Sequence, residues 1–412
     1  MTTETEHVGG GCPDVLLFAD FRNPHALGWR DGLLDSSVPV HCASSEPCEG
    51  FDYSPDLVGW ARGKVVASGY NNRIRQMLSS IGRNEGSLTA AHCSSSISKS
   101  QILESLATLT RYRKRRKFLE TVAGSPGSTI IHALRIPYEG VSLCAWRRGD
   151  PLVVSSWGQD FAVQANRDPL LARRVRELMP RLSGFAYDNV EDLEWAYRYG
   201  LSVRVPTLQI AGNFGVDETL FFPTASLERQ PSVTVLYPRG LRDYVDHRLF
   251  LRLAKDPVFS DCRFVGVGLA GDPFAEESRD QNDQLSLTPN LGRAEFAELM
   301  RGCDVVVSPA ISDGTPNSIL EALACGAHVL AGDIPPLRAL SAELDSESLV
   351  LLSLDQYERW RDALIDTVAR IRDRRPNSDS RPLLPDPYKR GANRVRVREF
   401  YARVLHYGDG LA

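Results

Sequence analysis

The sequence predicts an α/β protein built from two doubly wound parallel sheets, and three observations support this prediction. The chain has 412 residues, enough for two domains, since domains usually contain about 100 to 200 residues. Short apolar and β-branched runs alternate with helical patterns in both halves of the chain. Glycine, proline and polar residues interrupt that alternation at residues 212–231, where we place the boundary and the cleft between the halves.

The first half opens with a buried strand at residues 14–19, a short helix and a second strand at 38–42. This opening lacks the Gly-x-Gly-x-x-Gly fingerprint, which disfavours a dinucleotide cofactor. The remaining elements expected in this half are strands at 129–133, 152–155 and 202–205 and a helix at 170–178.

The same alternation resumes after residue 231. The elements expected there are strands at 234–237, 263–267, 304–307 and 328–331 and helices at 248–254, 293–301 and 316–325. A proline-rich break at 381–387 precedes a last helical stretch at 393–407.

Composition places few limits on the ligands and partners of this chain. At 42% hydrophobic and 24% charged residues with a net charge of -4, it gives no reason to expect nucleic acid. No apolar run reaches the roughly 18 residues of a membrane span, and the polar opening is unlike a secretory signal, so we expect a cytoplasmic protein. The eight cysteines form no Cys-x-x-Cys pair, which disfavours structural zinc and a disulfide framework.

An acidic loop follows the expected strand at 304–307. Asp313 and Gly314 stand just past its carboxyl end, where open α/β sheets bind their ligands. Thr315 is expected to cap the next helix, with Pro316 in its first turn.

The start of that helix is predicted to bind phosphate. The amides of Asn317 and Ser318 and the positive end of the helix dipole would face the crevice, and Gly326 closes the other end of the helix. Glu321, on the second turn, would reach a different pair of hydroxyls from Asp313. One loop and one helix are thus placed to hold both ends of a nucleotide sugar.

The run from Asp313 to Gly326 resembles the acidic-x7-Glu signature of glycosyltransferase family 4, although the family usually has Glu where Asp313 stands. Three further segments resemble family motifs in the same order, over about residues 14–340. They are a Trp-Gly-x-Asp strand end at 151–160, the exit from the first domain at 213–217, and the first donor-domain strand with its phosphate-binding arginine at 233–240.

This resemblance implies a retaining enzyme of the GT-B fold, with two Rossmann-like domains facing a cleft and a last helix crossing back to the first domain. We expect an acceptor-binding domain at 1–212, a donor-binding domain at 213–388 and a crossing helix at 389–412. In the family the first acidic residue usually holds the transferred sugar and the second the ribose. The donor site would therefore contain Asp313, Gly314, Thr315, Pro316, Asn317, Ser318 and Glu321.

Positive charge for the diphosphate is expected from Arg239, because a guanidinium matches a phosphate in shape and stays charged. The family usually pairs this arginine with a lysine, but Tyr244 stands at that position. Arg242, Arg248 or His247 could compensate, although Arg248 also fits a solvated helix face.

Residues 287–290, which include Pro289 and Asn290, are expected to contact the base mainly through the backbone, so UDP and GDP both stay open. Catalysis is expected to need no metal or other cofactor, since amides and Arg239 can stabilise the departing diphosphate. The resemblance implies that the acceptor attacks the face that the leaving group vacates. A double displacement would need a carboxylate nucleophile, for which Asp160 is the candidate, though its position also suits capping.

Three further residues are candidate contacts in the first domain. His132 ends an apolar strand and is predicted to be catalytic, and His25 lies in the first strand–helix loop. His25, Trp157 and Asp160 are predicted to contact the acceptor, although a structural histidine or a core tryptophan would give the same pattern.

The acceptor itself is predicted to be a small soluble molecule, as in specialised metabolism, although the loops at 42–54, 60–72 and 137–140 carry no recognisable chemistry that identifies it. The alternatives are a lipid-linked or cell-surface glycan acceptor, a sugar-nucleotide epimerase, and a non-catalytic protein that only binds nucleotide sugars. The basic run at 111–117 could rest on an anionic membrane, but a solvated helix face is favoured. A homodimer is left open.

Overall fold

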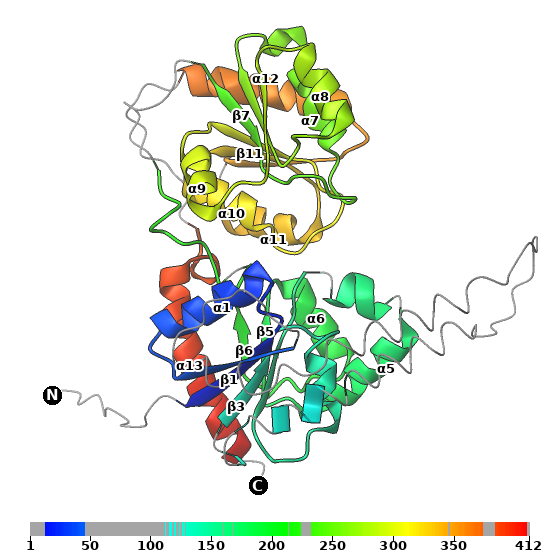
Figure 1. Cartoon of the computed structure of the whole chain (residues 1–412), viewed down its shortest axis with the longest axis vertical. Coiled ribbons are helices and arrows are strands. Elements are labelled where there is room, and N and C mark those ends of the chain that lie inside the picture. Colours follow the sequence, from blue (N-terminus) through cyan, green and yellow to red (C-terminus); the bar gives the residue numbers. More distant parts are fainter. Residues whose placement is uncertain are drawn as a thin grey trace, which may run out of the picture.

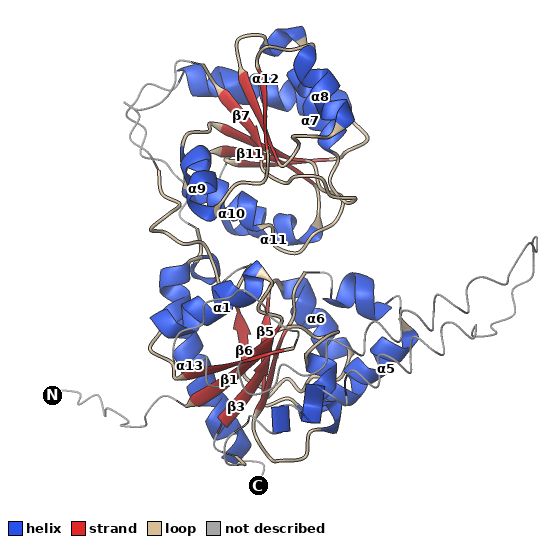
Figure 2. Ribbon diagram, viewed as in Figure 1, coloured by secondary structure: helices blue, strands red, loops and turns tan. Residues whose placement is uncertain are grey.

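The computed structural model describes residues 13–45, 112, 115–117, 119, 120, 123, 126, 127, 129–158, 160–166, 168–212, 214–223, 232–344, 347–373 and 384–409. These residues form two six-stranded parallel sheets, each flanked by helices (Figure 1; Figure 2). The predicted two-sheet α/β architecture is thereby confirmed.

The first sheet has the strand order β2-β1-β3-β4-β5-β6. The chain runs outward from β1 to β2 and then returns to place β3 on the other side of β1. The carboxyl ends of β1 and β3 therefore flank a topological switch point, where such sheets open a crevice. The strands are β1 Asp14–Ala19, β2 Val40–Ser44, β3 Thr129–Ala133, β4 Leu152–Ser155, β5 Gly184–Tyr187 and β6 Thr207–Gln209.

Helices and short helical turns cover this sheet. They are α1 Pro24–Asp35, η1 Gly140–Ala145, the π-helical turn η2 Asp160–Ala165, α5 Pro169–Leu178, η3 Met179–Arg181, α6 Val190–Arg198 and, from the far end of the chain, α13 Arg390–Asp409.

The second sheet has the order β12-β11-β10-β7-β8-β9, which puts its switch point between β7 and β10. Its strands are β7 Thr234–Tyr237, β8 Arg263–Val267, β9 Leu285–Thr288, β10 Val305–Ser308, β11 His328–Gly332 and β12 Leu349–Leu352. Its helices are α7 His247–Ala254, η5 Pro257–Phe259, α8 Pro273–Asp280, α9 Arg293–Arg301, α10 Asn317–Ala324, α11 Pro335–Leu344, α12 Tyr357–Asp373 and η6 Asp386–Tyr388.

Side-chain caps fix where several helices begin. Asn23, Asp168, Asn189, Asp246 and Asp272 each accept a hydrogen bond from a backbone N–H in the first turn of the helix that follows. These short polar side chains satisfy donors that have no partner inside the helix.

One predicted strand is wrong. Residues 202–205 form a turn, and the edge strand lies at 207–209, where Thr207 pairs with Phe185 of β5. Three of the four predicted residues are exposed, and only Val205 is buried, so they lack the burial of a sheet strand. β5 itself was not predicted, and β2 lies two residues later than expected.

Helix α13 packs on the first sheet, as the predicted crossing helix should (Figure 1). Its buried residues Val397, Phe400 and Val404 join the core that contains Val15 and Leu17 of β1. Beside them Tyr401 bonds the Nδ1 atom of His132 through its hydroxyl at 2.6 Å. The last helix of the chain therefore completes the core of the first domain.

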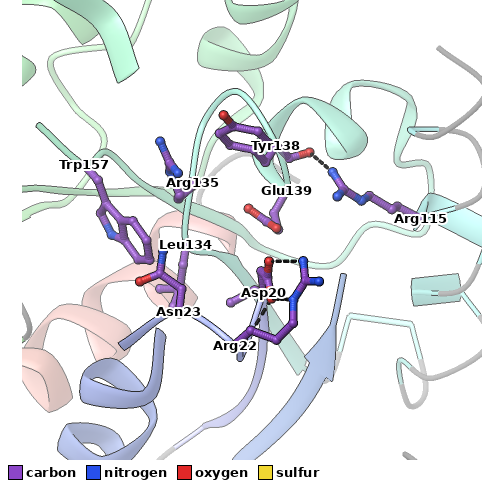
Figure 3. Close-up of a pocket in the computed structure, with 10 residues that line it drawn as sticks. Asp20, Arg22, Asn23, Arg115, Leu134, Arg135, Tyr138, Glu139 and Trp157 are labelled. Atoms are coloured by element: carbon purple, nitrogen blue, oxygen red, sulfur yellow. Dashed lines mark hydrogen bonds and ion pairs between the residues drawn. The ribbon is translucent and has the colours of Figure 1, made fainter. Parts of the chain in front are cut away.

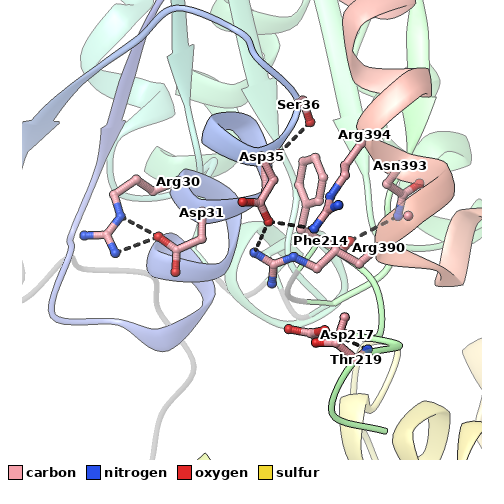
Figure 4. A network of polar contacts seen from close by, with 12 residues as sticks. Arg30, Asp31, Asp35, Ser36, Phe214, Asp217, Thr219, Arg390, Asn393 and Arg394 are labelled. Carbon is pink, nitrogen blue, oxygen red and sulfur yellow. Dashed lines mark hydrogen bonds and ion pairs between the residues drawn. The ribbon is translucent and has the colours of Figure 1, made fainter. Parts of the chain in front are cut away.

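Two stretches of chain cross between the domains side by side. The Val216 amide donates to the Tyr388 carbonyl at 2.8 Å, and the Arg390 amide donates to the Val216 carbonyl at 3.0 Å. Next to them Asp35 of α1 pairs with Arg394 at 2.8 Å and with Arg390 at 3.4 Å (Figure 4).

Phe214 holds a strained backbone at this crossing. Its φ of 70° is rare for a residue with a bulky side chain, yet its ring is fully buried and meets Trp29 edge-on. Its carbonyl also accepts a hydrogen bond from the Asn393 side chain at 3.3 Å. Packing and hydrogen bonding thus hold the strained residue in place. Asn213, the neighbouring motif residue, lies outside the described residues.

Tyr401→Phe should lower the free energy of unfolding by about 1–3 kcal/mol, because the buried His132 ring would lose its partner. Chemical denaturation measures the change, with Arg398→Ala on the exposed side of α13 as the control. Unchanged stability in Tyr401→Phe would show that the bond is not needed.

Candidate active site

Asp313 and Arg239 meet at the switch point of the second sheet. Arg239 follows β7 and Asp313 follows β10, and the Arg239 guanidinium forms an ion pair with the Asp313 carboxylate. The other Nη atom of Arg239 lies 3.5 Å from the Ser318 hydroxyl. Burial raises the pKa of Asp313 above its ordinary value, while Arg239 opposes that shift. Arg239, which was predicted to bind the diphosphate, is therefore in direct contact with Asp313, the carboxylate predicted to bind the transferred sugar.

Glu321 projects from α10 into the same region and is almost completely buried. Burial raises the pKa of its carboxyl to about 7, against the opposing charges of Arg293 and Arg239. Arg293, at the first turn of α9, donates to Glu321 at 2.6 Å and lies over the ring of Phe221. Glu321 thus needs a partner cation that the sequence analysis did not identify as part of the site.

The start of α10 differs from the prediction in one respect. Pro316, not Thr315, occupies the N-cap position, and no side chain caps the helix. The amides of Ile319 and Leu320 already bond to the Pro316 carbonyl, so the amide of Ser318 lies at the open first turn. Gly326, with a φ of 78°, ends the helix as expected.

Thr315 is instead tied to the first domain. Its amide donates at 2.6 Å to the carboxylate of Asp188, a residue that follows β5, and the Gly212 amide donates to the other oxygen at 2.8 Å. Asp188 is buried, and burial together with the nearby charge of Asp313 raises its pKa to about 6. The Asp188 carboxylate therefore connects Gly212, near the point where the chain passes between the domains, to Thr315 in a loop of the second domain.

Glycines allow the two domains to touch at this point. A Cβ added to Gly158 would lie 2.7 Å from the Gly314 Cα, and one added to Gly212 would overlap the Asn317 side chain. Both Gly158 and Gly212 also have positive φ values. Gly158, the residue after Trp157, consequently lies directly against Gly314 in the loop that carries Asp313. We call residues 313–315 the donor loop.

The three predicted acceptor contacts gather on this side of the first domain. The rings of His25 and Trp157 lie 5.0 Å apart. Asp160 is fully buried and accepts hydrogen bonds from the amides of Trp157 and Ile136, each at 3.2 Å, and from Arg135 at 2.9 Å. Asp160 therefore positions its own loop and Arg135, and a ligand would meet Arg135 rather than this carboxylate.

Other predicted donor contacts lie around the same edge of the second sheet. Arg242 is exposed, and its charge acts to lower the pKa of Asp313. The Asn290 side chain reaches the backbone of Gly240 and Gly268, beside the exposed Pro289. These loops follow strands β7, β8 and β9.

Arg248 and His247 lie elsewhere. The Arg248 guanidinium is 5.1 Å from the ring of Phe274, and His247 approaches Asp272 at 3.8 Å. Both contacts are with the loop and helix that follow β8, so the structure does not bring either side chain against Asp313.

The prediction of a catalytic His132 is corrected. The ring is fully buried, and its two nitrogens contact the hydroxyls of Tyr401 at 2.6 Å and Ser155 at 2.7 Å. Burial lowers the pKa of His132 to about 3, so the ring is neutral near pH 7. A polar residue on an apolar strand was interpreted as functional, whereas it serves the packing of α13.

Sequence reasoning also missed residues of the first domain. The loop at 137–140, which carried no recognisable chemistry, places Tyr138 and Glu139 on a cavity with Arg135. Most of the loops at 42–54 and 60–72 lies outside the described residues. The signal that was available for the 137–140 loop was its position after the apolar strand at 129–133.

Within the described ranges, no group of three or more His, Cys, Asp or Glu side chains could hold a metal ion. None of the helices there combines the length and apolar character that a bilayer-spanning segment needs. In the basic run, Arg115 is buried and Arg116 pairs with Glu120, while Lys117 is exposed.

Comparisons with known proteins agree with this geometry. Residues 235–371 match the family model described as Glycosyl transferases group 1. A curated Campylobacter jejuni protein, N,N'-diacetylbacillosaminyl-diphospho-undecaprenol alpha-1,3-N-acetylgalactosaminyltransferase, is 25% identical over 127 residues. That match covers 28% of this chain and 30% of the relative, so it spans less than a third of the relative's length.

Solved structures resemble the whole fold. Sucrose-phosphate synthase from Thermosynechococcus elongatus has a TM-score of 0.58 at 16% identity, covering 96% of this chain and 98% of the other. A structure described as trehalose-6-phosphate from E. coli bound with UDP-2-fluoro glucose has a TM-score of 0.53 at 11% identity, covering 97% and 98%. The fold is that of the GT-B glycosyltransferases. Residues 235–371 are thus similar in sequence to the glycosyl transferases of group 1.

Asp188→Asn should loosen the contact between the domains. An amide keeps one acceptor oxygen and turns its NH₂ group toward a backbone N–H, so either Gly212 or Thr315 loses its acceptor. Small-angle X-ray scattering should show a larger radius of gyration in the variant. Glu191→Gln, an exposed neighbour, is the matched control, and identical curves for all three proteins would contradict this role.

Glu321 should make stability depend on pH. Its pKa rises from 4.5 in the unfolded chain to about 7 in the folded protein, so the folded state binds more protons between these values. The free energy of unfolding contributed by this group therefore falls as pH rises from about 4.5 to about 7. The free energies of unfolding of wild type and Glu321→Gln should diverge in that window, because only the wild type loses stability through this group as pH rises. Parallel profiles would contradict the assignment.

Proposed function

We propose that the protein is a retaining glycosyltransferase that moves a sugar from a UDP- or GDP-sugar to a small acceptor. The observation that supports this proposal best is the cluster at the β7/β10 switch point. There Arg239 joins Asp313 and Ser318, and its charge also acts on Glu321. A cation, a helix N-terminus and two separated carboxylates match a diphosphate with a sugar on either side.

Each group has a separate task in this proposal. Arg239 and the amide of Ser318 stabilise the negative charge that grows on the leaving diphosphate. Asp313 binds a hydroxyl of the transferred sugar, and Glu321 binds the ribose. Because Asp313 already holds Arg239, the guanidinium is in position before the donor arrives.

The bond changes balance without an enzymic nucleophile. The bond from the anomeric carbon to the diphosphate oxygen breaks, and the acceptor oxygen forms its bond on the same face. The acceptor proton passes to a phosphate oxygen of the leaving group. The burial of Asp160 supports this route over a double displacement, because its oxygens are bonded to Arg135 and to backbone amides.

The donor and acceptor classes are proposed from the compared proteins and from the cavity of the first domain. The E. coli neighbour is described with bound UDP-2-fluoro glucose, so UDP-sugars are tested first and GDP-sugars second. The name of the C. jejuni relative describes a diphospho-undecaprenol-linked acceptor, which keeps a lipid-linked acceptor as the second candidate. We propose a small acceptor first because the first domain presents a small cavity lined by Trp157, whose neighbour Gly158 contacts the loop that carries Asp313.

The test separates binding from turnover. Glu321→Ala should weaken UDP or GDP binding by about tenfold to a hundredfold, because its loss leaves Arg293 without its partner and the ribose without its acceptor. Asp313→Ala should reduce turnover more than binding of the bare nucleotide. Arg239→Ala should lower turnover by about 10²- to 10³-fold. Calorimetry and nucleotide-release assays measure the two effects.

Two exposed residues of the same domain serve as controls. Glu298→Ala on α9 and Arg263→Ala at the amino end of β8 remove equal charges away from the switch point. Equal loss of nucleotide binding in Glu321→Ala and Asp313→Ala would contradict the division of roles. Nucleotide binding with no turnover for any donor and acceptor pair would instead indicate a binding protein without catalysis.

A further inference from the structure

The polar cavity of the first domain that Tyr138, Glu139 and Arg135 line carries a further inference. It has a volume of about 290 Å³, and the residues that define its chemistry are Asp20, Arg22, Arg115, Arg135, Glu139 and Trp157 (Figure 3). Asp20 and Arg22 follow β1, Arg135 and Glu139 follow β3, and Trp157 follows β4. The cavity therefore lies at the β1/β3 switch point of the first sheet, as the donor cluster lies at that of the second.

The cavity is next to the proposed reaction centre. Trp157 lines it, and the following residue, Gly158, contacts the Gly314 backbone of the donor loop. Asp313, the proposed sugar-binding carboxylate, is the neighbour of Gly314. A molecule in this cavity would thus lie across one loop from the transferred sugar.

Hydrogen-bond donors dominate the lining. Arg135 extends between the rings of Tyr138 and Trp157, with its guanidinium carbon 4.5 Å and 5.3 Å from their centroids (Figure 3). One Nη atom of Arg135 is used by Asp160, whereas its Nε atom is buried without a partner. The indole Nε1 of Trp157 is also buried without a partner. Both buried donors need an oxygen atom that the described protein does not supply.

The acceptor groups of the lining are largely in use. The two oxygens of Asp20 accept from Arg22 at 2.9 Å and 2.7 Å. Glu139 accepts from the Ser45 hydroxyl at 2.5 Å, and burial raises the pKa of its carboxyl, which favours the uncharged form. Three guanidinium groups thus face a cavity that is lined by only two carboxylates.

We propose that this cavity binds the acceptor, and that the acceptor carries a phosphate or carboxylate group near the hydroxyl that receives the sugar. This inference rests on the proposed glycosyl transfer and names its acceptor class. Arg22, Arg115 and Arg135 bind the anionic group, because guanidinium groups match the oxygens of both anions. Trp157 and Tyr138 flank the apolar face of the same molecule.

The volume of the cavity limits the size of the acceptor. Small-molecule sites usually measure about 300–1,000 Å³, so a cavity of about 290 Å³ fits a molecule at the small end of that range. A monosaccharide with one charged group has that scale. A polysaccharide chain would have to extend out of the cavity.

Calorimetry with three matched probes tests the inference. Glucose, glucose 6-phosphate and glucuronate share a ring and differ in charge, and each is titrated into the full chain saturated with UDP. At least one charged probe should bind about tenfold or more tightly than glucose, as expected for one added charged hydrogen bond. Preference between the two charged probes identifies the anion.

Variants test whether the residues of this cavity cause the preference for a charged probe. Arg22→Gln should reduce binding of the preferred charged probe by about tenfold and leave glucose binding nearly unchanged. Arg135→Lys keeps a positive charge beside the buried Asp160 but removes the planar fork, and should also weaken the charged probe. Arg173→Gln, an exposed arginine of α5, is the matched control and should bind all probes like wild type.

The outcomes separate this inference from the proposed function. If UDP and GDP both fail to bind, the proposed function fails and the acceptor site loses its basis. If nucleotide binds but glucose binds as tightly as both charged probes, or no probe binds, the acceptor class is wrong while donor binding stands. A charge preference that survives in both Arg22→Gln and Arg135→Lys would place the anion site elsewhere and overturn the inference.

Discussion

The contact between the two domains beside Asp313 depends on the carboxylate of Asp188. Taking a carboxylate out of water is costly, and the raised pKa of Asp188 reflects that cost. Backbone N–H groups from Gly212 and Thr315 compensate, and they belong to different parts of the chain. Because the bond to Thr315 holds the loop that carries Asp313, the first domain helps to position this loop. Both domains therefore contribute to the candidate site.

Three ion pairs fix the side chains of the candidate site. Arg239 faces Asp313, Arg293 faces Glu321, and Arg135 faces Asp160. In the pairs of Glu321 and Asp160 the carboxylate is almost or fully buried and the arginine is more accessible, whereas Arg239 and Asp313 are both largely buried. Buried carboxylates thus orient guanidinium groups before any ligand arrives, which reduces the ordering that binding requires.

The sequence predicted what depends on local patterns and on sheet topology. Strands such as β10 were identified from their continuous β-branched runs, whereas Asp313 was assigned from its position just past a strand and Arg239 from a resemblance to a family motif. The tie between Asp188 and Thr315 could not be predicted, since it joins residues 127 positions apart. His132 was misjudged for the same reason, because its partner Tyr401 is 269 positions away. Arg293 was seen only as the first residue of a helix.

The packing of α13 sets the order in which this protein can be made. Val397, Phe400, Tyr401 and Val404 belong to the same core as β1, although the ribosome synthesises them after every described strand of both sheets. The second domain contains all of its strands before those residues emerge. The second domain can therefore fold before α13 is synthesised, whereas part of the apolar surface of the first domain stays uncovered until α13 is available. For this fold the usual order, in which the N-terminal domain folds first, is reversed at its final step.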